Sequence, residues 1–161
     1  MTDTYPDLLK SMSAEDADAV VALARRHSLP SGAVLFQLGA DADHLYVIDR
    51  GRVNLTLPMQ VFGSEEDILV EERVAGQTLG WSALIPPHRF TLKATAKIDT
   101  ELLAFPRAAM LAHFASHSEV GYAVVRNVAA TVGQRLQVFQ AMWLREMKRV
   151  LELSHGTGST L

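Results

Sequence analysis

The segment Gly80–Ala96, GWSALIPPHRFTLKATA, gathers the side chains of this chain that are best suited to bind a small ligand. They comprise two aromatic rings, two hydroxyls and one guanidinium, from Trp81, Phe90, Ser82, Thr91 and Arg89. Such groups bind a flat or anionic molecule by stacking and hydrogen bonding. None of them is an activated nucleophile. The segment therefore predicts noncovalent binding rather than catalysis.

Other sequence motifs give no support for an enzyme. No nucleophile elbow, Walker loop or dinucleotide glycine pattern is present, and the glycines of Gly76–Gly80 lack a following Lys-Ser/Thr. His113 and His117 are four residues apart, a spacing that can place two metal ligands on one helix face. Without a cysteine or third ligand nearby, we interpret them as a solvated helix end and predict no metal. His44 and His88 receive no role.

Two acidic groups lie in the middle of the chain, at Glu65–Asp67 and at Glu71 and Glu72. We interpret both groups as solvated charges of a hairpin. The alternative is an acidic tip that binds a protein partner.

Composition limits the class of protein. The 161 residues fit one domain with a long appendage, and 48% hydrophobic with 20% charged residues is ordinary for a globular fold. A net charge of -3 provides no basic face for nucleic acid. The absence of cysteine fits the cytoplasm, and no segment is apolar and long enough to span a membrane. We therefore expect a cytoplasmic protein with no membrane contact.

The elements that position the ligand-binding segment can be predicted from periodicity. Ser13 is a helix cap, Arg25–His27 falls in the last turn of that helix, and Leu29–Gly32 stops it. Six short strands follow, at Val34–Gln37, Leu45–Asp49, Arg52–Leu57, Ile68–Val74, Phe90–Ala96 and Glu101–Phe105. Asp49–Arg52 reads as a tight turn in which Gly51 has a positive φ, and Met59–Asp67 reads as an exposed hairpin tip.

Helical periodicity returns after the last strand. A short helix is predicted at Pro106–Ala115 and a much longer one at Ser118–Leu153, and the tail Ser154–Leu161 is predicted to be disordered. We expect Val124, Val125 and Val128 to pack on the strands. An apolar seam with near-heptad spacing continues along the long helix through Ala129, Val132, Leu136, Phe139, Trp143, Met147 and Val150.

The run Leu29–Val53 carries a family resemblance. The run resembles the entry strands of cyclic-nucleotide-binding domains. The matching residues are Pro30, Gly32, Leu35-Phe36, Gly39, Asp43, Leu45-Tyr46, Ile48, Gly51 and Val53. Pro30 is shifted by one residue, and Ala40 stands in place of an acid. The resemblance covers about Met12 to Leu136. It implies an α+β, mainly β fold: an antiparallel β-roll or jelly roll (double-stranded β-helix) with an N-terminal helix and a long C-terminal helix. We assign residues 1–117 to the roll, 118–153 to a dimerisation helix and 154–161 to the tail.

The phosphate-binding cassette of that family aligns with this chain without a gap. The resemblance assigns the ligand pocket to Leu79, Gly80, Trp81, Ser82, Ala83, Leu84, Arg89, Phe90 and Thr91. Trp81 stands where the family has a glutamate that binds the ribose hydroxyl. Phe90 stands where the family has the arginine that pairs with the cyclic phosphate. Each lost charged contact is worth on the order of 1.5–3 kcal/mol, so the resemblance predicts an altered pocket that does not bind cAMP or cGMP tightly.

Three interpretations of the pocket stay open. The two aromatic rings fill it and leave a ligand-free dimeric scaffold, or they bind another small aromatic ligand. In the third, Arg89 and backbone amides preserve a genuine cAMP or cGMP receptor. No cofactor is assigned with certainty.

The resemblance also bears on assembly. We expect a homodimer through the C-terminal helix, with its interface at Val132, Leu136, Phe139, Trp143, Met147 and Val150. The resembled transcription factors continue into a DNA-reading helix-turn-helix, and this sequence has no basic recognition helix. We therefore expect no DNA binding by this chain alone, and we leave open a separate protein partner.

Overall fold

The computed structural model describes residues 6–156. These residues form two compact units, one that ends at Val128 and one that begins at Ala129. The first unit holds all the strands and most of the helices, and the second holds the remainder of the last helix.

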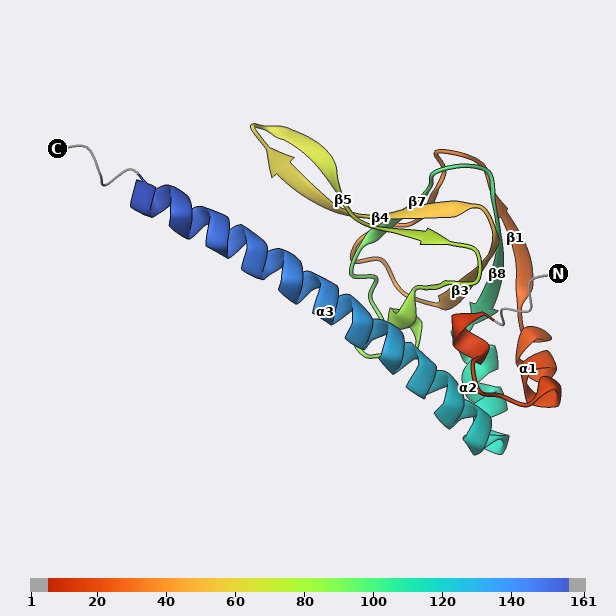
Figure 1. The fold of residues 1–161 in the computed structure, drawn as a ribbon. Coiled ribbons are helices and arrows are strands. Elements are labelled where there is room, and N and C mark those ends of the chain that lie inside the picture. The colour runs from red at the N-terminus through yellow and green to blue at the C-terminus, as the bar shows by residue number, and fades with distance from the viewer. Residues whose placement is uncertain (1–5, 157–161) are drawn as a thin grey trace. The chain divides into compact units, whose positions relative to one another are not determined.

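Two four-stranded antiparallel sheets form the first unit (Figure 1). In one sheet the order is β1 (Arg25–Leu29), β8 (Thr100–Pro106), β3 (His44–Arg50) and β6 (Thr78–Leu79). In the other it is β2 (Val34–Phe36), β7 (Lys93–Ala96), β4 (Arg52–Val61) and β5 (Ser64–Val74). This arrangement confirms the predicted mainly antiparallel β-roll.

The core lies between the facing surfaces of the two sheets. Directly opposed residues of neighbouring strands share a face, so register assigns each side chain to the inside or the outside. Ile48 and Leu102 are opposed in the β3–β8 sheet, and Leu55 and Ala94 are opposed in the β4–β7 pair. All four are buried, and Tyr46, on the same face as Ile48, stacks on Phe36 of the other sheet, which identifies these rows as the inner wall.

The turn between β3 and β4 depends on glycine, as predicted. Gly51 has φ 110°, and a Cβ there would lie 2.4 Å from Thr100 Oγ1. That hydroxyl accepts a hydrogen bond from the Arg52 amide at 3.1 Å. Both the backbone angle and the close approach of β8 therefore exclude a side chain at this position.

The first helix is shorter than predicted. α1 spans Ala14–Val21, and Ser13 caps it by accepting from the Asp16 amide at 3.1 Å. Arg25–Leu29 is strand β1, paired antiparallel with β8, so the expected basic last turn is wrong. Four of the five β1 residues are exposed and only Leu29 is buried. The strand lies at a sheet edge, where backbone pairing rather than an apolar alternation holds it.

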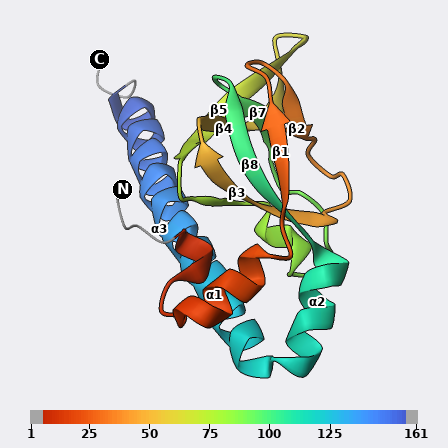
Figure 2. The ribbon, with the colours of Figure 1, turned by 90° about the vertical axis from the view of Figure 1, so that its right-hand side faces the viewer.

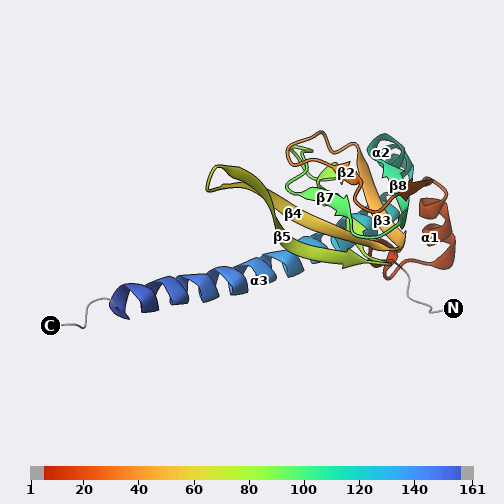
Figure 3. The ribbon, with the colours of Figure 1, turned by 90° about the horizontal axis from the view of Figure 1, so that it is seen from above.

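The other predicted elements differ mainly at their ends. β7 begins at Lys93 rather than Phe90, and β6 and β1 were not predicted. The predicted tip Met59–Asp67 is mostly strand, because β4 and β5 pair up to Val61 and Ser64. Only Phe62 and Gly63 form the turn, with φ values of 49° and 85°. This hairpin extends beyond the rest of its sheet (Figure 3).

Helices close one end of the roll. η1 (Asp7–Leu9), α1 and α2 (Arg107–Ser116) lie near the same end of strands β1 and β8 (Figure 2). α3 (Ser118–Gly156) begins in the first unit, where Val120, Val124 and Val128 are buried. Val125 is 42% exposed, so its predicted packing on the strands is wrong. The Asn127 amide donates to the Leu8 and Lys10 carbonyls at 2.8 and 2.9 Å.

The second unit continues α3 to Gly156. Ser154–Gly156 is therefore helical rather than disordered, which corrects the first part of the predicted tail. The remainder of that tail, 157–161, lies outside the described residues.

Candidate functional site

The cassette begins where β6 ends. Leu79 is buried, and Gly80 takes a left-handed conformation with φ 72° that turns the chain into the short 3-10 helix η2 (Trp81–Ala83). A Cβ on Gly80 would lie 3.1 Å from both the His44 carbonyl oxygen and Phe90 Cε1. Glycine is therefore required here by conformation and by the two neighbours that press on it.

Phe90 is part of the core. Its side chain is only 4% exposed, and its ring stacks on that of Phe36 with centroids 3.8 Å apart and planes at 7°. Phe36 also stacks on Tyr46 at 6.1 Å. The three rings join the β4–β7 sheet to the β3–β8 sheet. The position at which we predicted loss of the phosphate-binding arginine therefore holds an apolar ring packed between the sheets.

Arg89 has the opposite orientation. Its side chain is exposed, and Nη1 lies 3.5 Å from the Gly39 carbonyl oxygen. The backbone around it is bridged to the loop after β2, since Arg89 pairs with Asp41 and Phe90 exchanges hydrogen bonds with Gly39 and Ala40 at 2.7 and 3.0 Å. This bridge separates the two neighbouring side chains, one inward and one outward.

The remaining cassette residues do not form one cluster of polar groups. Ser82 and Ala83 are buried, Trp81 and Leu84 are half-buried, and Thr91 is exposed. The amides of Ala83 and Leu84 donate to the carbonyls of Gly80 and Trp81 at 3.0 and 3.1 Å. Those two amides are thus used within the turn. His88, whose Nδ1 lies 3.1 Å from the Ser82 carbonyl oxygen, closes the loop that follows.

Tyr46 is the half-buried member of the aromatic cluster. Burial, together with the negative charge of Asp43, raises the pKa of the Tyr46 hydroxyl to about 12. Asp43 itself lies 2.9 Å from His44 Nδ1.

A buried arginine elsewhere on the inner wall escaped the sequence analysis. Arg73 on β5 has a side chain only 6% exposed, and its Nη2 lies 3.0 Å from Glu71 Oε1. Its Nε has no hydrogen-bond partner among residues 6–156. Glu71 is therefore partly exposed to water, as a hairpin charge was expected to be, but it is also paired with a buried guanidinium.

A β-bulge explains why periodicity missed this residue. Thr56 opposes Leu69 and Leu55 opposes Glu71, so Val70 is the extra residue on β5. In a regular strand Ile68, Val70, Glu72 and Val74 would share one face, and Arg73 would lie on the opposite face. The bulge reverses the alternation, and Arg73 then opposes the buried Val53.

The neighbouring acids lie in ion pairs on the outer side. Lys97 donates a hydrogen bond to Glu72 and, with Arg52 at 3.4 Å, holds the pKa of that carboxyl below its usual range. Asp67 pairs with Lys93. Glu72 and Asp67 are thus bound to lysines rather than simply solvated.

His113, on α2, stacks on His117, the residue that follows the helix. The His113 and His117 rings lie 4.2 Å apart with planes at 11°. His117 Nδ1 lies 3.1 Å from the His113 carbonyl oxygen. No group of three or more His, Cys, Asp or Glu side chains within residues 6–156 is placed to hold a metal ion.

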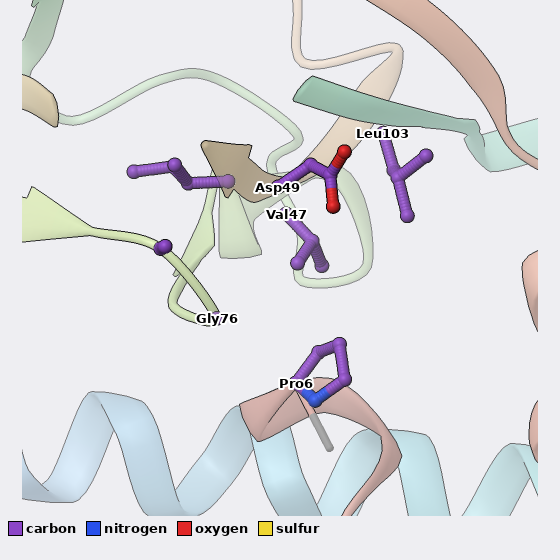
Figure 4. A pocket seen from close by; sticks show the side chains of 7 residues that line it. Pro6, Val47, Asp49, Gly76 and Leu103 are labelled. Carbon is purple, nitrogen blue, oxygen red and sulfur yellow. The ribbon is translucent and has the colours of Figure 1, made fainter. Parts of the chain in front are cut away.

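A cavity of about 500 Å³ lies on the other side of the β3–β8 sheet. Figure 4 shows Pro6, Val47, Asp49, Gly76 and Leu103 around it. Val47 and Leu103 are opposed in register and belong to the row next to Ile48 and Leu102, so this cavity faces away from the roll interior. The carboxylate that lines this cavity belongs to Asp49, which pairs with Arg26 at 3.3 Å.

Comparison with known proteins gives the family. The model of the cyclic nucleotide-binding domain matches residues 26–117, which is more than half of the chain. The chain therefore belongs to the cyclic nucleotide-binding domain family, and the predicted resemblance is confirmed. No curated protein sequence matches the chain.

Solved structures with the same fold include regulators and stand-alone domains. The Thermus thermophilus catabolite activator protein is 26% identical, with a TM-score of 0.67 over 92% of this chain and 63% of that one. The N-terminal domain of a Streptomyces coelicolor transcriptional regulator is 24% identical, with a TM-score of 0.68 over 85% and 94%. A cyclic nucleotide-binding domain from Methylobacillus flagellatus is 20% identical, with a TM-score of 0.65 over 88% and 74%. Within residues 6–156, no helix is long and apolar enough to cross a membrane.

Proposed function

We propose that this chain is a non-enzymatic regulatory sensor whose pocket has been altered so that it does not bind cAMP or cGMP tightly. The observation that carries the proposal is the burial of Phe90, stacked on Phe36 at 3.8 Å, at the position aligned with the phosphate-binding arginine. A phenyl ring offers no donor to a phosphate. A phosphate placed beside it would lose its hydration without a charged partner.

Arg89 is the side chain that favours the competing proposal of a genuine cyclic-nucleotide receptor. Its exposed guanidinium lies near the Gly39 carbonyl oxygen, and to reach the position of Phe90 it would have to break the backbone bridge with Asp41. That bridge includes the Phe90 hydrogen bonds to Gly39 and Ala40. Breaking it costs more than the rotation of a side chain, which supports the altered pocket over the receptor.

Calorimetric titration with cAMP and with cGMP tests the proposal. We expect no binding at micromolar concentrations in the wild type and a marked gain in Trp81→Glu/Phe90→Arg, which restores both charged side chains of the family. Two lost contacts at ~1.5–3 kcal/mol each correspond to at least a hundredfold in affinity. Micromolar binding by the wild type that Arg89→Met abolishes would establish the receptor instead.

We also propose that the chain forms a homodimer through the second unit. Leu136, Trp143 and Val150 recur every seven residues and are 58, 63 and 56% exposed, and Phe139 and Met147 between them are 40 and 38% exposed. A continuous apolar stripe of this kind on a helix is typical of a partner surface. Val132 is the sixth residue assigned to the interface.

Sedimentation of Trp143→Asp tests the dimer. A carboxylate in the middle of a helix–helix interface opposes association, so we expect a shift towards monomer. Val138→Asp is the matched control, since Val138 is also exposed (55%) but lies three or four residues from none of the proposed interface residues. An unchanged dimer in Trp143→Asp would place the interface elsewhere.

A further inference from the structure

The cavity on the outer side of the β3–β8 sheet has no part in the function proposed above. Its volume is about 500 Å³, a size that can hold a small molecule. Figure 4 shows the Val47, Asp49 and Leu103 side chains on one side of the cavity and Pro6 on the other. All of its lining residues belong to the first unit, so the cavity is complete within one compact body.

One row of side chains runs from this cavity towards the solvent. Val47 opposes Leu103, and Leu103 opposes Arg26 on the edge strand β1. Because opposed residues share a face, all three side chains lie on the outer side of the sheet. Val47 is 1% exposed, Leu103 is half-buried and the Arg26 side chain is 77% exposed. The row therefore passes from a buried apolar wall to a hydrated guanidinium across three strands.

A β-bulge brings a carboxylate to the same place. The register of β3 against β8 shifts between Ile48 and Arg50, so Asp49 is the extra residue on β3. Such a residue leaves the regular alternation of the strand, and its side chain is re-aimed. Asp49 lines the cavity and also a second depression of about 440 Å³, which it shares with Arg26, Arg50 and Glu101. Asp49 is thus the residue at which an apolar space and a charged space meet.

The ion pair between Asp49 and Arg26 can open to admit a ligand. Asp49 Oδ2 and Arg26 Nη1 are 3.3 Å apart, and the two side chains are 47 and 77% exposed. An ion pair between exposed side chains contributes little to stability, so its loss costs little. A molecule that carries both charges would replace this one contact with two charge-assisted contacts.

The two charges select a ligand by what they repel as well as by what they attract. An apolar anion such as a fatty acid would be repelled by Asp49, and an apolar amine would be repelled by Arg26. A molecule with an ammonium group beside a carboxylate satisfies both side chains. An aliphatic chain on the same molecule would bury its surface against the apolar wall. This combination is the chemistry of an aliphatic α-amino acid.

We propose that this cavity binds an aliphatic α-amino acid. The ammonium group donates to the Asp49 carboxylate, the ligand carboxylate accepts from the Arg26 guanidinium, and the aliphatic side chain packs on Val47 and Leu103. The site lies on the opposite face of the β3–β8 sheet from the aromatic cluster around Tyr46. It therefore does not depend on whether the cyclic-nucleotide pocket is altered.

Calorimetric titration with leucine tests the assignment. We expect the wild type to bind leucine below millimolar concentration. Arg26→Met and Asp49→Asn should each weaken this affinity about 10- to 100-fold, because each removes one charged contact. Both side chains are exposed, so neither substitution should prevent folding. No binding by the wild type at millimolar leucine, or an unchanged affinity in Arg26→Met, overturns the proposal.

Arg25→Met is the matched control for Arg26→Met. Arg25 is the neighbouring arginine on the same edge strand and is also exposed. Adjacent residues of a strand point to opposite faces, so the loss of Arg25 should leave leucine affinity unchanged. An equal loss of affinity in both variants would show a general effect of charge and would contradict the site.

Two analogues of leucine assign each charge to its side chain. Leucinamide keeps the ammonium group and lacks the carboxylate, so it should bind more weakly than leucine and with the same affinity to the wild type and to Arg26→Met. The aliphatic acid 4-methylpentanoate keeps the carboxylate and lacks the ammonium group, so it should bind more weakly than leucine and no more weakly to Asp49→Asn than to the wild type. Either analogue binding the wild type as tightly as leucine contradicts the proposed contacts.

Methyl NMR locates the ligand without any substitution. Leucine should shift the methyl resonances of Val47 and Leu103 in the wild type. It should leave unchanged those of Val53, which is buried on the inner face of the other sheet. Unshifted Val47 and Leu103 resonances, or shifts at Val53 alone, overturn the proposed site.

Discussion

At one end of the inner wall, Phe36 and Phe90 stack face to face with no charge between them, whereas at the other end Arg73 holds a guanidinium in the same interior. At the cassette end, burial and the negative charge of Asp43 raise the pKa of the half-buried Tyr46 to about 12. At the β5 end, Arg73 forms an ion pair with Glu71, and the Arg73 Nε has no hydrogen-bond partner within residues 6–156. The interior of this roll is therefore not uniformly apolar, since stacked rings at one end coexist with a buried guanidinium at the other.

The largest effect that would break this comparison is expected from Phe90→Ala. If the ring is core, its removal leaves a cavity against Phe36 and lowers the free energy of unfolding by about 3–5 kcal/mol. Chemical denaturation measures this change. Phe62→Ala is the control, since Phe62 is fully exposed at the hairpin turn and its loss should cost less than about 0.5 kcal/mol. A cost below about 1 kcal/mol for Phe90→Ala would show that the ring lines a collapsible ligand space instead.

Gly80→Ala tests how firmly Phe90 is packed at the cassette end, and we expect a smaller loss of stability than for Phe90→Ala. An alanine here meets an unfavourable left-handed φ and also the Phe90 ring and the His44 carbonyl at 3.1 Å. Gly76→Ala is the control, because Gly76 has a similar φ of 83° but no neighbour within 4 Å of an added Cβ. We expect Gly80→Ala to lower the free energy of unfolding by about 1 kcal/mol more than Gly76→Ala does. Equal costs would mean that Phe90 yields easily and is not firmly packed.

Arg73→Met tests the β5 end of the wall. We expect this substitution to change the free energy of unfolding by no more than about 1 kcal/mol. Glu71 is 31% exposed and keeps access to water after the arginine is gone, so no fully buried charge is left behind. Denaturant titration beside Phe90→Ala gives the comparison directly. A loss as large as that of Phe90→Ala would mean that both ends of the wall are structural.

The smallest effect is a pH dependence at high pH from Tyr46. Because the pKa of this hydroxyl is raised in the folded protein from 10.0 to about 12, its contribution to stability is complete below pH 10 and is lost as the pH rises through 12. Tyr46→Phe should remove that part of the alkaline destabilisation. Absorbance of tyrosinate checks the cause, because Tyr46→Phe should remove the ionisation that is delayed to about pH 12. If the substitution instead removed an ionisation near pH 10, burial would not raise the pKa of this hydroxyl.

Sequence patterns predicted the roll because its turns and helix caps depend on the type of residue at a few neighbouring positions. The tight turn at Gly51 and the helix cap at Ser13 are local features, and both are present as predicted. Strand β1 was missed because an edge strand with four exposed residues has no apolar alternation. Its partner is about 75 residues further along the chain, and only the tertiary fold brings them together.

The candidate site was only partly accessible to the same reasoning. The resemblance predicted that Trp81 and Phe90 replace charged residues of the family. Whether Phe90 or Arg89 faces inward depends on the backbone bridge with Asp41. Arg73 was inaccessible, because one extra residue at Val70 reverses the face on which every following β5 side chain lies. Irregular backbone of this kind leaves no mark in a period-two pattern.

The Asn127 amide bonds to Leu8 and Lys10 have a consequence for the order in which the chain assembles. They join residues 119 and 117 positions apart. During synthesis the first segment emerges from the ribosome long before its partner on α3 exists, so it cannot be fixed in place by this contact until nearly all of the roll has been made. The contact between Asn127 and the segment Leu8–Lys10 is thus a late, high-contact-order event.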